Sequence, residues 1–236
     1  MFEEIYASAW HHPGIAWIAG VPLLALAVIA MRQGRRAVDP DPRRAAGLWA
    51  FVILELAILL DAWFTGALSP VGATGVAAET AAVFFVIVGD LRFFYLVERQ
   101  RGLARPGIAQ SLRALAVALP VSFAAPVITM VLKLIDAKRY SGNLLYLIYE
   151  ACVLVLVIVF CALRTPKVHD GADGRARYVR RLLTFEVAQY GAWIIADILI
   201  LRGVPAAWAL RILPNTLYYA CFVPVATLST PPGTRT

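Results

Sequence analysis

Residues 83–102 read VFFVIVGDLRFFYLVERQRG and place Asp90 and Arg92 two positions apart in an otherwise apolar run. Such a run is typical of a membrane-crossing helix, because about 20 apolar residues span a hydrocarbon core of about 30 Å. With about 3.6 residues per turn, positions i and i+2 point to nearly opposite sides of a helix. We therefore predict that Arg92 pairs with Glu55 or Glu186 on another helix, and that Asp90 needs a different partner.

The whole chain has the composition of this stretch. Of its 236 residues, 61% are hydrophobic and only 16% are charged, whereas a soluble domain is about a quarter charged. We predict an all-α polytopic membrane protein that forms a single domain over residues 1–236, with no room for a soluble domain. The seven predicted transmembrane helices cover residues 13–31, 47–69, 76–98, 111–133, 143–163, 178–201 and 206–229.

The basic residues are distributed unevenly among the predicted loops. Residues 32–46, 99–113 and 164–181 carry fifteen Lys and Arg, and the alternate loops carry four. The positive-inside rule then predicts an N-terminus outside and a C-terminus in the cytoplasm. We attribute the net charge of +7 to orientation and to contact with anionic lipid, not to nucleic acid. We expect an integral protein of the bacterial inner membrane.

Two predicted spans contain internal prolines, Pro120 and Pro126 in the fourth and Pro214 and Pro224 in the seventh. Proline within a helix removes a backbone hydrogen bond and is a common cause of kinks. We expect both spans to be interrupted.

Ionisable residues inside the spans are the main functional signal. A charge at the centre of a membrane costs about 2.5–3.5 kcal/mol on insertion scales, so such residues normally face the bundle interior. Seven acids lie within the spans. Two of them, Glu79 and Asp197, lie within about a turn of the outer boundary, where solvent or Arg211 can neutralise them. The candidate catalytic acids are the other five: Glu55, Asp61, Asp90, Glu150 and Glu186.

These acids admit a structural interpretation and a chemical one. Each carboxyl can serve packing alone, through an interhelical hydrogen bond. Apart from the basic residues already counted with the loops, the spans contain two arginines, Arg92 and Arg211, against these seven acids, so we expect some carboxyls to be neutral. A neutral carboxylic acid in apolar surroundings can act as a proton donor. We expect no metal site, because His11, His12 and His169 all lie outside the spans.

The chain resembles the small seven-helix integral-membrane terpene cyclases of meroterpenoid biosynthesis. Its second span, LWAFVILELAILLD, has Glu55 in the place of the family's essential glutamate, and its third, FFVIVGDLRFFYLVE, has the family's apolar run, aspartate and aromatics. The seventh span, ILPNTLYYACF, departs from the pattern, because Asn215 and Tyr218 stand where an aspartate is expected.

The resemblance implies a cofactor-free enzyme that protonates an epoxide or alkene of a lipophilic prenyl or terpenoid substrate and guides a carbocation cyclisation. Aromatic faces stabilise such cations. The expected substrate-binding residues are Arg92, Phe84, Tyr190, Trp193, Asn215, Tyr218 and Tyr219. The alternative is a proton-coupled small-molecule transporter or a seven-helix sensor, in which the carboxyls form a relay.

Overall fold

The computed structural model describes residues 42–65, 69–72, 75–101, 108–165 and 173–229, and every regular element within these ranges is helical. The prediction of an all-α fold is therefore confirmed. Within these ranges, five long helices are followed by a series of short helical segments. The elements are α3 (Pro42–Phe64), α4 (Val76–Arg99), α5 (Ile108–Ile135), α6 (Gly142–Arg164), α7 (Asp173–Leu201), α8 (Ala207–Leu210), α9 (Ile212–Thr216), the π-helix η3 (Leu217–Cys221) and α10 (Phe222–Leu228).

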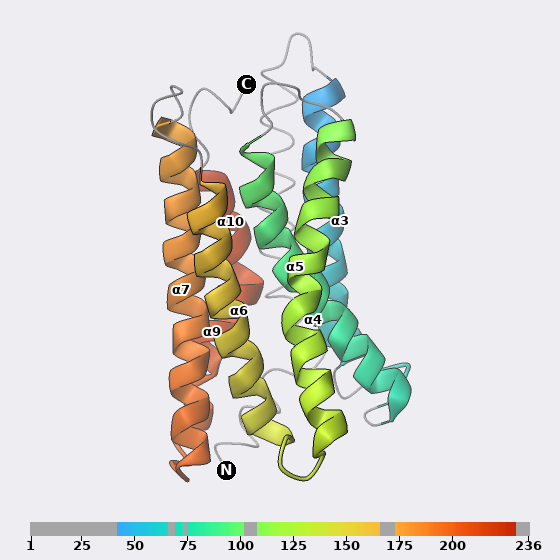
Figure 1. Ribbon diagram of the computed structural model, residues 1–236, viewed down its shortest axis with the longest axis vertical. Helices are drawn as coiled ribbons and strands as arrows, with labels where there is room; N and C mark the ends of the chain where they lie inside the picture. The colour runs from blue at the N-terminus through green and yellow to red at the C-terminus, as the bar shows by residue number, and fades with distance from the viewer. Residues whose placement is uncertain (1–41, 66–68, 73–74, 102–107, 166–172, 230–236) are drawn as a thin grey trace.

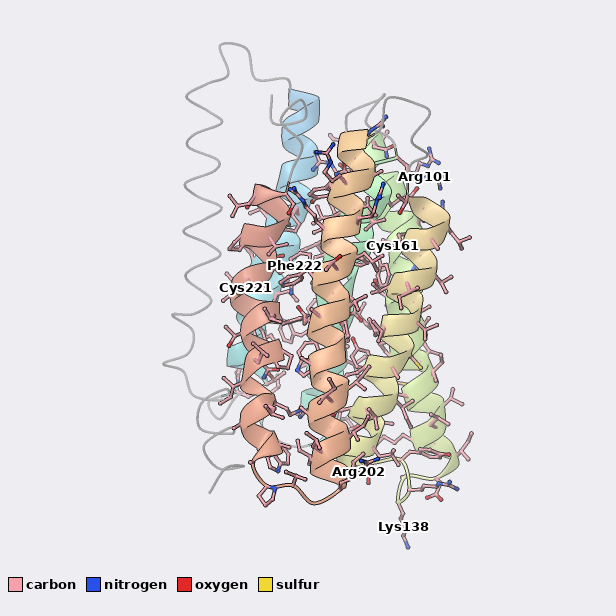
Figure 2. The ribbon with its side chains drawn as sticks, turned by 90° about the vertical axis from the view of Figure 1, so that its left-hand side faces the viewer. Arg101, Lys138, Cys161, Arg202, Cys221 and Phe222 are labelled. Atoms are coloured by element: carbon pink, nitrogen blue, oxygen red, sulfur yellow. The ribbon has the colours of Figure 1, made fainter. Side chains whose placement is uncertain are left out.

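The long helices lie side by side and alternate in direction, so that the α5–α6 connection and the end of α7 share the lower end of the bundle in Figure 1. Helix α4 contacts α3, α5 and α6, and α7 contacts α6 and the short helices α8, α9 and α10. In Figure 2, Arg101 lies near the upper end of the bundle, whereas Lys138 and Arg202 lie at the lower end. The alternation brings the start of α3, the end of α4, the end of α6 and the start of α7 toward the same end of the bundle.

The bundle buries a set of charged and polar side chains within an apolar core, and its outer surface is also apolar. The C-terminal half of α4 is enclosed, with twelve consecutive residues from Ile87 to Glu98 buried. Large apolar side chains point outward on the surrounding helices, such as Ile53 on α3, Ile128 on α5 and Val155 on α6. Within the described ranges, four helices (α4, α5, α6 and α7) are long and apolar enough to cross a membrane.

The predicted spans agree with the helices to different degrees. The third to sixth correspond to α4–α7, while the first, at residues 13–31, lies outside the described residues. The second was predicted at 47–69, but α3 covers residues 42–64. The prediction was wrong at this end: α3 ends at Phe64, whose carbonyl accepts a hydrogen bond from the Ser69 hydroxyl at 2.6 Å.

The two proline-containing spans differ from each other. Helix α5 continues through Pro120 and Pro126, so the predicted interruption there is wrong. The seventh span is broken into α8, α9, η3 and α10, as expected. Pro214 is the third residue of α9, where a missing amide proton costs no intrahelical hydrogen bond. Pro224 follows closely on η3, in a helical run that is continuous from Ile212 to Leu228.

Candidate functional site

Arg92 occupies the centre of the bundle and contacts three segments. Its Nη1 lies 3.0 Å from Oε2 and 3.3 Å from Oε1 of Glu55 on α3, and both side chains are 1% exposed. Its guanidinium carbon lies 4.3 Å from the ring centroid of Tyr218 and 4.1 Å from that of Phe222. The prediction that Arg92 pairs with an acid of another helix is confirmed, and the partner is Glu55.

The π-helix supplies a further acceptor for Arg92. In a regular α-helix the Phe222 amide would bind the Tyr218 carbonyl, but here it binds the Leu217 carbonyl one residue earlier. The freed Tyr218 carbonyl accepts a hydrogen bond from Arg92 Nη2 at 2.6 Å. The π-turn thus fixes the guanidinium, which is consistent with the frequent occurrence of such turns at functional sites.

Asp90 points away from this ion pair and joins three helices. Its carboxylate accepts hydrogen bonds from the hydroxyls of Tyr149 on α6 and Tyr190 on α7. Asp90 and Tyr190 are buried. The different partner that the spacing required for Asp90 is therefore a pair of tyrosines. Tyr149 had not been identified from the sequence, where one tyrosine in an apolar helix carries no distinguishing signal.

Helix α7 adds two further buried polar side chains near Arg92 and Asp90, those of Glu186 and Gln189. Glu186 is 4% exposed and lies within electrostatic reach of Arg92, Asp90 and Glu55. Among the described residues it forms no hydrogen bond and no close ion pair. Gln189, one turn further along α7, is 1% exposed, and neither its Oε1 nor its Nε2 has a hydrogen-bond partner in the described part of the chain.

An aromatic wall borders these acids; we use the term for the rings of Tyr190, Trp193, Tyr218 and Tyr219. Successive ring centroids are 5.2, 5.5 and 4.8 Å apart. These spacings are typical of interacting aromatic pairs. The aromatic wall therefore connects the two polar groups of the site: Tyr190 is bonded to Asp90, and Tyr218 packs on Arg92.

Polar groups fix the orientation of two of these rings. The Trp193 indole donates to Asn215 Oδ1 at 2.7 Å, and the Tyr219 hydroxyl donates to the Asp61 carboxylate. The structure thus brings together most of the side chains chosen from the sequence. Phe84 and Glu150 are exceptions: Phe84 is 51% exposed on the outer side of α4, and Glu150 lies with Arg211 in a separate cluster. The sequence context of Phe84 did not distinguish it from interior aromatics.

Gly89 provides the space for Tyr218. A Cβ atom added at Gly89 would lie 1.5 Å from the Tyr218 hydroxyl oxygen and 2.6 Å from Cζ. The ring of Tyr218 therefore packs directly on the backbone of α4, one residue before Asp90. Small residues that allow such close approach are common between membrane helices, but the sequence alone did not single out Gly89.

A second charged cluster lies toward the lower end of the bundle. Arg211 contacts Asp197 through Nε–Oδ1 at 2.8 Å and Nη2–Oδ2 at 3.0 Å, of which only the second has hydrogen-bond geometry. Arg211 Nη2 also lies 3.4 Å from Glu150 Oε1. The expectation that Arg211 neutralises a neighbouring acid is confirmed for Asp197, although Asp197 is fully buried and not solvated. The other outer acid, Glu79, pairs with Lys133 in an exposed ion pair at 2.9 Å.

The arrangement offers acids and aromatic faces but no metal centre. Across the described helices, no group of three or more His, Cys, Asp or Glu side chains is placed to hold a metal ion. Comparison with protein-family models, with curated proteins and with solved structures gives no match. The chemistry of the site therefore has to be argued from its own geometry.

Proposed function

We propose that this chain is an integral-membrane terpene cyclase, which protonates an epoxide or alkene of a prenyl or terpenoid substrate and guides a carbocation cyclisation. One observation carries the proposal: the buried Asp90 carboxylate is joined to the aromatic wall through Tyr190. A carbocation cascade needs ring faces that stabilise the cation and a carboxylate that removes a proton at its end. Asp90 and the aromatic wall supply both requirements at one point of the bundle.

The aromatic faces already hold a cation. The Arg92 guanidinium stacks on Tyr218 and Phe222 at 4.3 and 4.1 Å. A desolvated cation over a ring gains about 2 kcal/mol or more. A carbocation moving along Trp193 and Tyr190 would meet rings of the same kind, and the nearby carboxylates would add electrostatic stabilisation.

The hydrogen-bond partners suggest different roles for the three central acids. Glu55 is matched to Arg92 at 3.0 Å, which suits a carboxylate that orients the guanidinium. Asp90 accepts two tyrosine hydroxyls, an arrangement that suits a carboxylate able to remove a proton at the end of the cascade. Glu186 forms no such pair with the described residues, and we assign it the role of proton donor.

The proposal includes a topology in the membrane. We retain seven spans, with the N-terminus outside and the C-terminus in the cytoplasm of a bacterial inner membrane. The loop charges of the sequence and the four apolar helices α4–α7 support this topology. A lipophilic substrate would enter from the bilayer, and the apolar outer surface of the bundle is suited to contact with lipid.

The test is turnover by the purified protein in nanodiscs. The substrates are a farnesylated phenol and its terminal epoxide, and a cyclised product is recognised as an isomer of unchanged mass with a different retention time. Glu186→Gln should lower turnover by about 10²–10⁴-fold, the range for loss of a general acid. Glu79→Gln is the matched control, because Glu79 lies in the exposed pair with Lys133, and it should retain activity. Equal activity of the two variants would contradict the assignment of Glu186.

A proton-coupled transporter or sensor is the second candidate, and the distribution of charges along the bundle favours it. Ion pairs occur at successive depths: Glu98 with Arg164 at 3.6 Å, Arg92 with Glu55, and Arg211 with Asp197 and Glu150. A relay for protons needs such groups from one face to the other. Proton uptake into liposomes loaded with a pH-sensitive dye, in the absence of any cyclised product, would establish this candidate in place of the cyclase.

A further inference from the structure

We propose that the Gln189 amide, beside the Glu186 carboxyl, is a subsite for a hydroxyl group carried by a lipophilic ligand. This inference rests on the proposed function only in taking the ligand to be lipophilic. It concerns binding, and it would hold equally for a transporter.

The first argument is the state of the Gln189 side chain. It is 1% exposed, and both polar atoms of its amide are without a hydrogen-bond partner among the described residues. Leaving a buried polar group without a hydrogen-bond partner destabilises the folded protein. An amide that served packing alone would be better replaced by an apolar side chain of the same shape, so an unpaired donor and acceptor indicate a binding role.

The second argument is the place of Gln189 on α7. Glu186, Gln189 and Trp193 follow the i, i+3, i+7 spacing of one helix stripe. The two ends of the stripe face the interior, because Glu186 interacts electrostatically with Arg92 and Trp193 contacts Asn215 and Tyr218. Gln189 lies between them and therefore faces the same interior, at the edge of the aromatic wall.

The third argument concerns the chemistry of the ligand. The amide offers one acceptor, Oε1, and the donor Nε2. A hydroxyl group matches both with a single oxygen. An ammonium group would leave the Nε2 donor unpaired, and an anion would leave Oε1 unpaired and lie beside the Glu186 carboxyl. Side chains at i and i+3 are about 5–6 Å apart at Cβ, so the same hydroxyl would lie within reach of Glu186.

Binding of three probes to the purified protein in nanodiscs tests the subsite without any turnover. The probes are farnesol, which donates and accepts, farnesyl methyl ether, which only accepts, and farnesene, which does neither. Each neutral hydrogen bond contributes about 0.5–1.5 kcal/mol. The wild-type protein should therefore bind farnesol about tenfold more tightly than farnesene, with the ether between them.

Gln189→Met is the matched variant, since it keeps the length of the side chain and removes the amide. It should lose most of the preference for farnesol over farnesene, of which only the part supplied by Glu186 remains, and without ligand it should melt at a higher temperature than the wild type, because two unpaired buried atoms are gone. Equal binding of the probes by the wild type, or an undiminished preference for farnesol in the variant, would overturn the proposal. The wild-type comparison needs no variant, so the test survives if Gln189→Met does not fold. Preferential binding of farnesol, together with no cyclisation of the farnesylated phenol or its epoxide, would leave the subsite in place and refute the cyclase.

Discussion

Substitution of Gly89 by alanine sets two physical effects of opposite sign against each other. Alanine is favoured over glycine in a helix interior by about 0.8–1.0 kcal/mol, so helix propensity alone predicts a more stable protein. The new Cβ atom would, however, lie 1.5 Å from the Tyr218 hydroxyl oxygen and 2.6 Å from Cζ. Neither distance is tolerable, so the ring of Tyr218 must move away from α4.

The cost of that movement follows from the contacts of the ring. Overpacking a tight interior costs about 1–3 kcal/mol. The guanidinium carbon of Arg92 lies 4.3 Å from the centroid of this ring. A displaced ring loses part of that stacking energy, a loss of about 1 kcal/mol. After subtraction of the propensity gain, Gly89→Ala should lower the free energy of unfolding by about 1–3 kcal/mol.

The assay is reversible unfolding by SDS in mixed detergent micelles, followed by circular dichroism. Gly191→Ala is the matched control, because it is also within a long helix and a Cβ there has nothing within 4 Å. It should be neutral or slightly stabilising. In a Tyr218→Phe background the nearest clashing atom is absent, so Gly89→Ala should cost less than in the wild type. A Gly89→Ala protein as stable as the Gly191→Ala protein would refute the reasoning.

Three further predictions concern the ion pair, the tyrosines and the topology. Arg92→Met should lower the free energy of unfolding by about 3–5 kcal/mol in the same assay, because it leaves the buried α3 carboxylate without its partner; a stable variant would contradict the pairing. Tyr149→Phe removes one hydroxyl from Asp90 and should cost about 1.5–3 kcal/mol, the range for hydrogen bonds to charged groups; no change would show that this bond contributes nothing. In a cysteine-free background, a membrane-impermeant maleimide should label a cysteine at Lys138 from outside intact cells and one at Arg101 only after lysis; the reverse result would invert the proposed topology.

The sequence predicted those features that depend on one helix at a time. Apolar length located α4, α5, α6 and α7, and the divergence of i and i+2 side chains predicted that Arg92 and Asp90 have different partners. The choice between Glu55 and Glu186 as the partner of Arg92 could not be made, because it depends on which helices are neighbours. That information lies in the packing and not in the periodicity.

Features that arise from contacts between helices could not be predicted from the sequence. The Tyr218 carbonyl is available to Arg92 only because η3 shifts the hydrogen-bond register by one residue. Gly89 is an ordinary small residue until Tyr218 packs on it. Phe84 was expected in the bundle interior but lies on its outside. The sequence could not show this, since outward-facing and interior aromatic residues have the same apolar neighbours in sequence.

Deuterium placement in the product tests the central claim, acid-initiated cyclisation in the bundle interior, most directly. The purified protein in nanodiscs is incubated in D₂O with the farnesylated phenol and, separately, with its terminal epoxide, and the products are analysed by chromatography and mass spectrometry after extraction into ordinary water. The account predicts a cyclic isomer from at least one probe. A product from the alkene should carry one carbon-bound deuterium, delivered by the acid, and a product from the epoxide should carry a new hydroxyl and no carbon-bound deuterium. Recovery of both probes unchanged, or a cyclic product of the alkene without deuterium, would contradict the account.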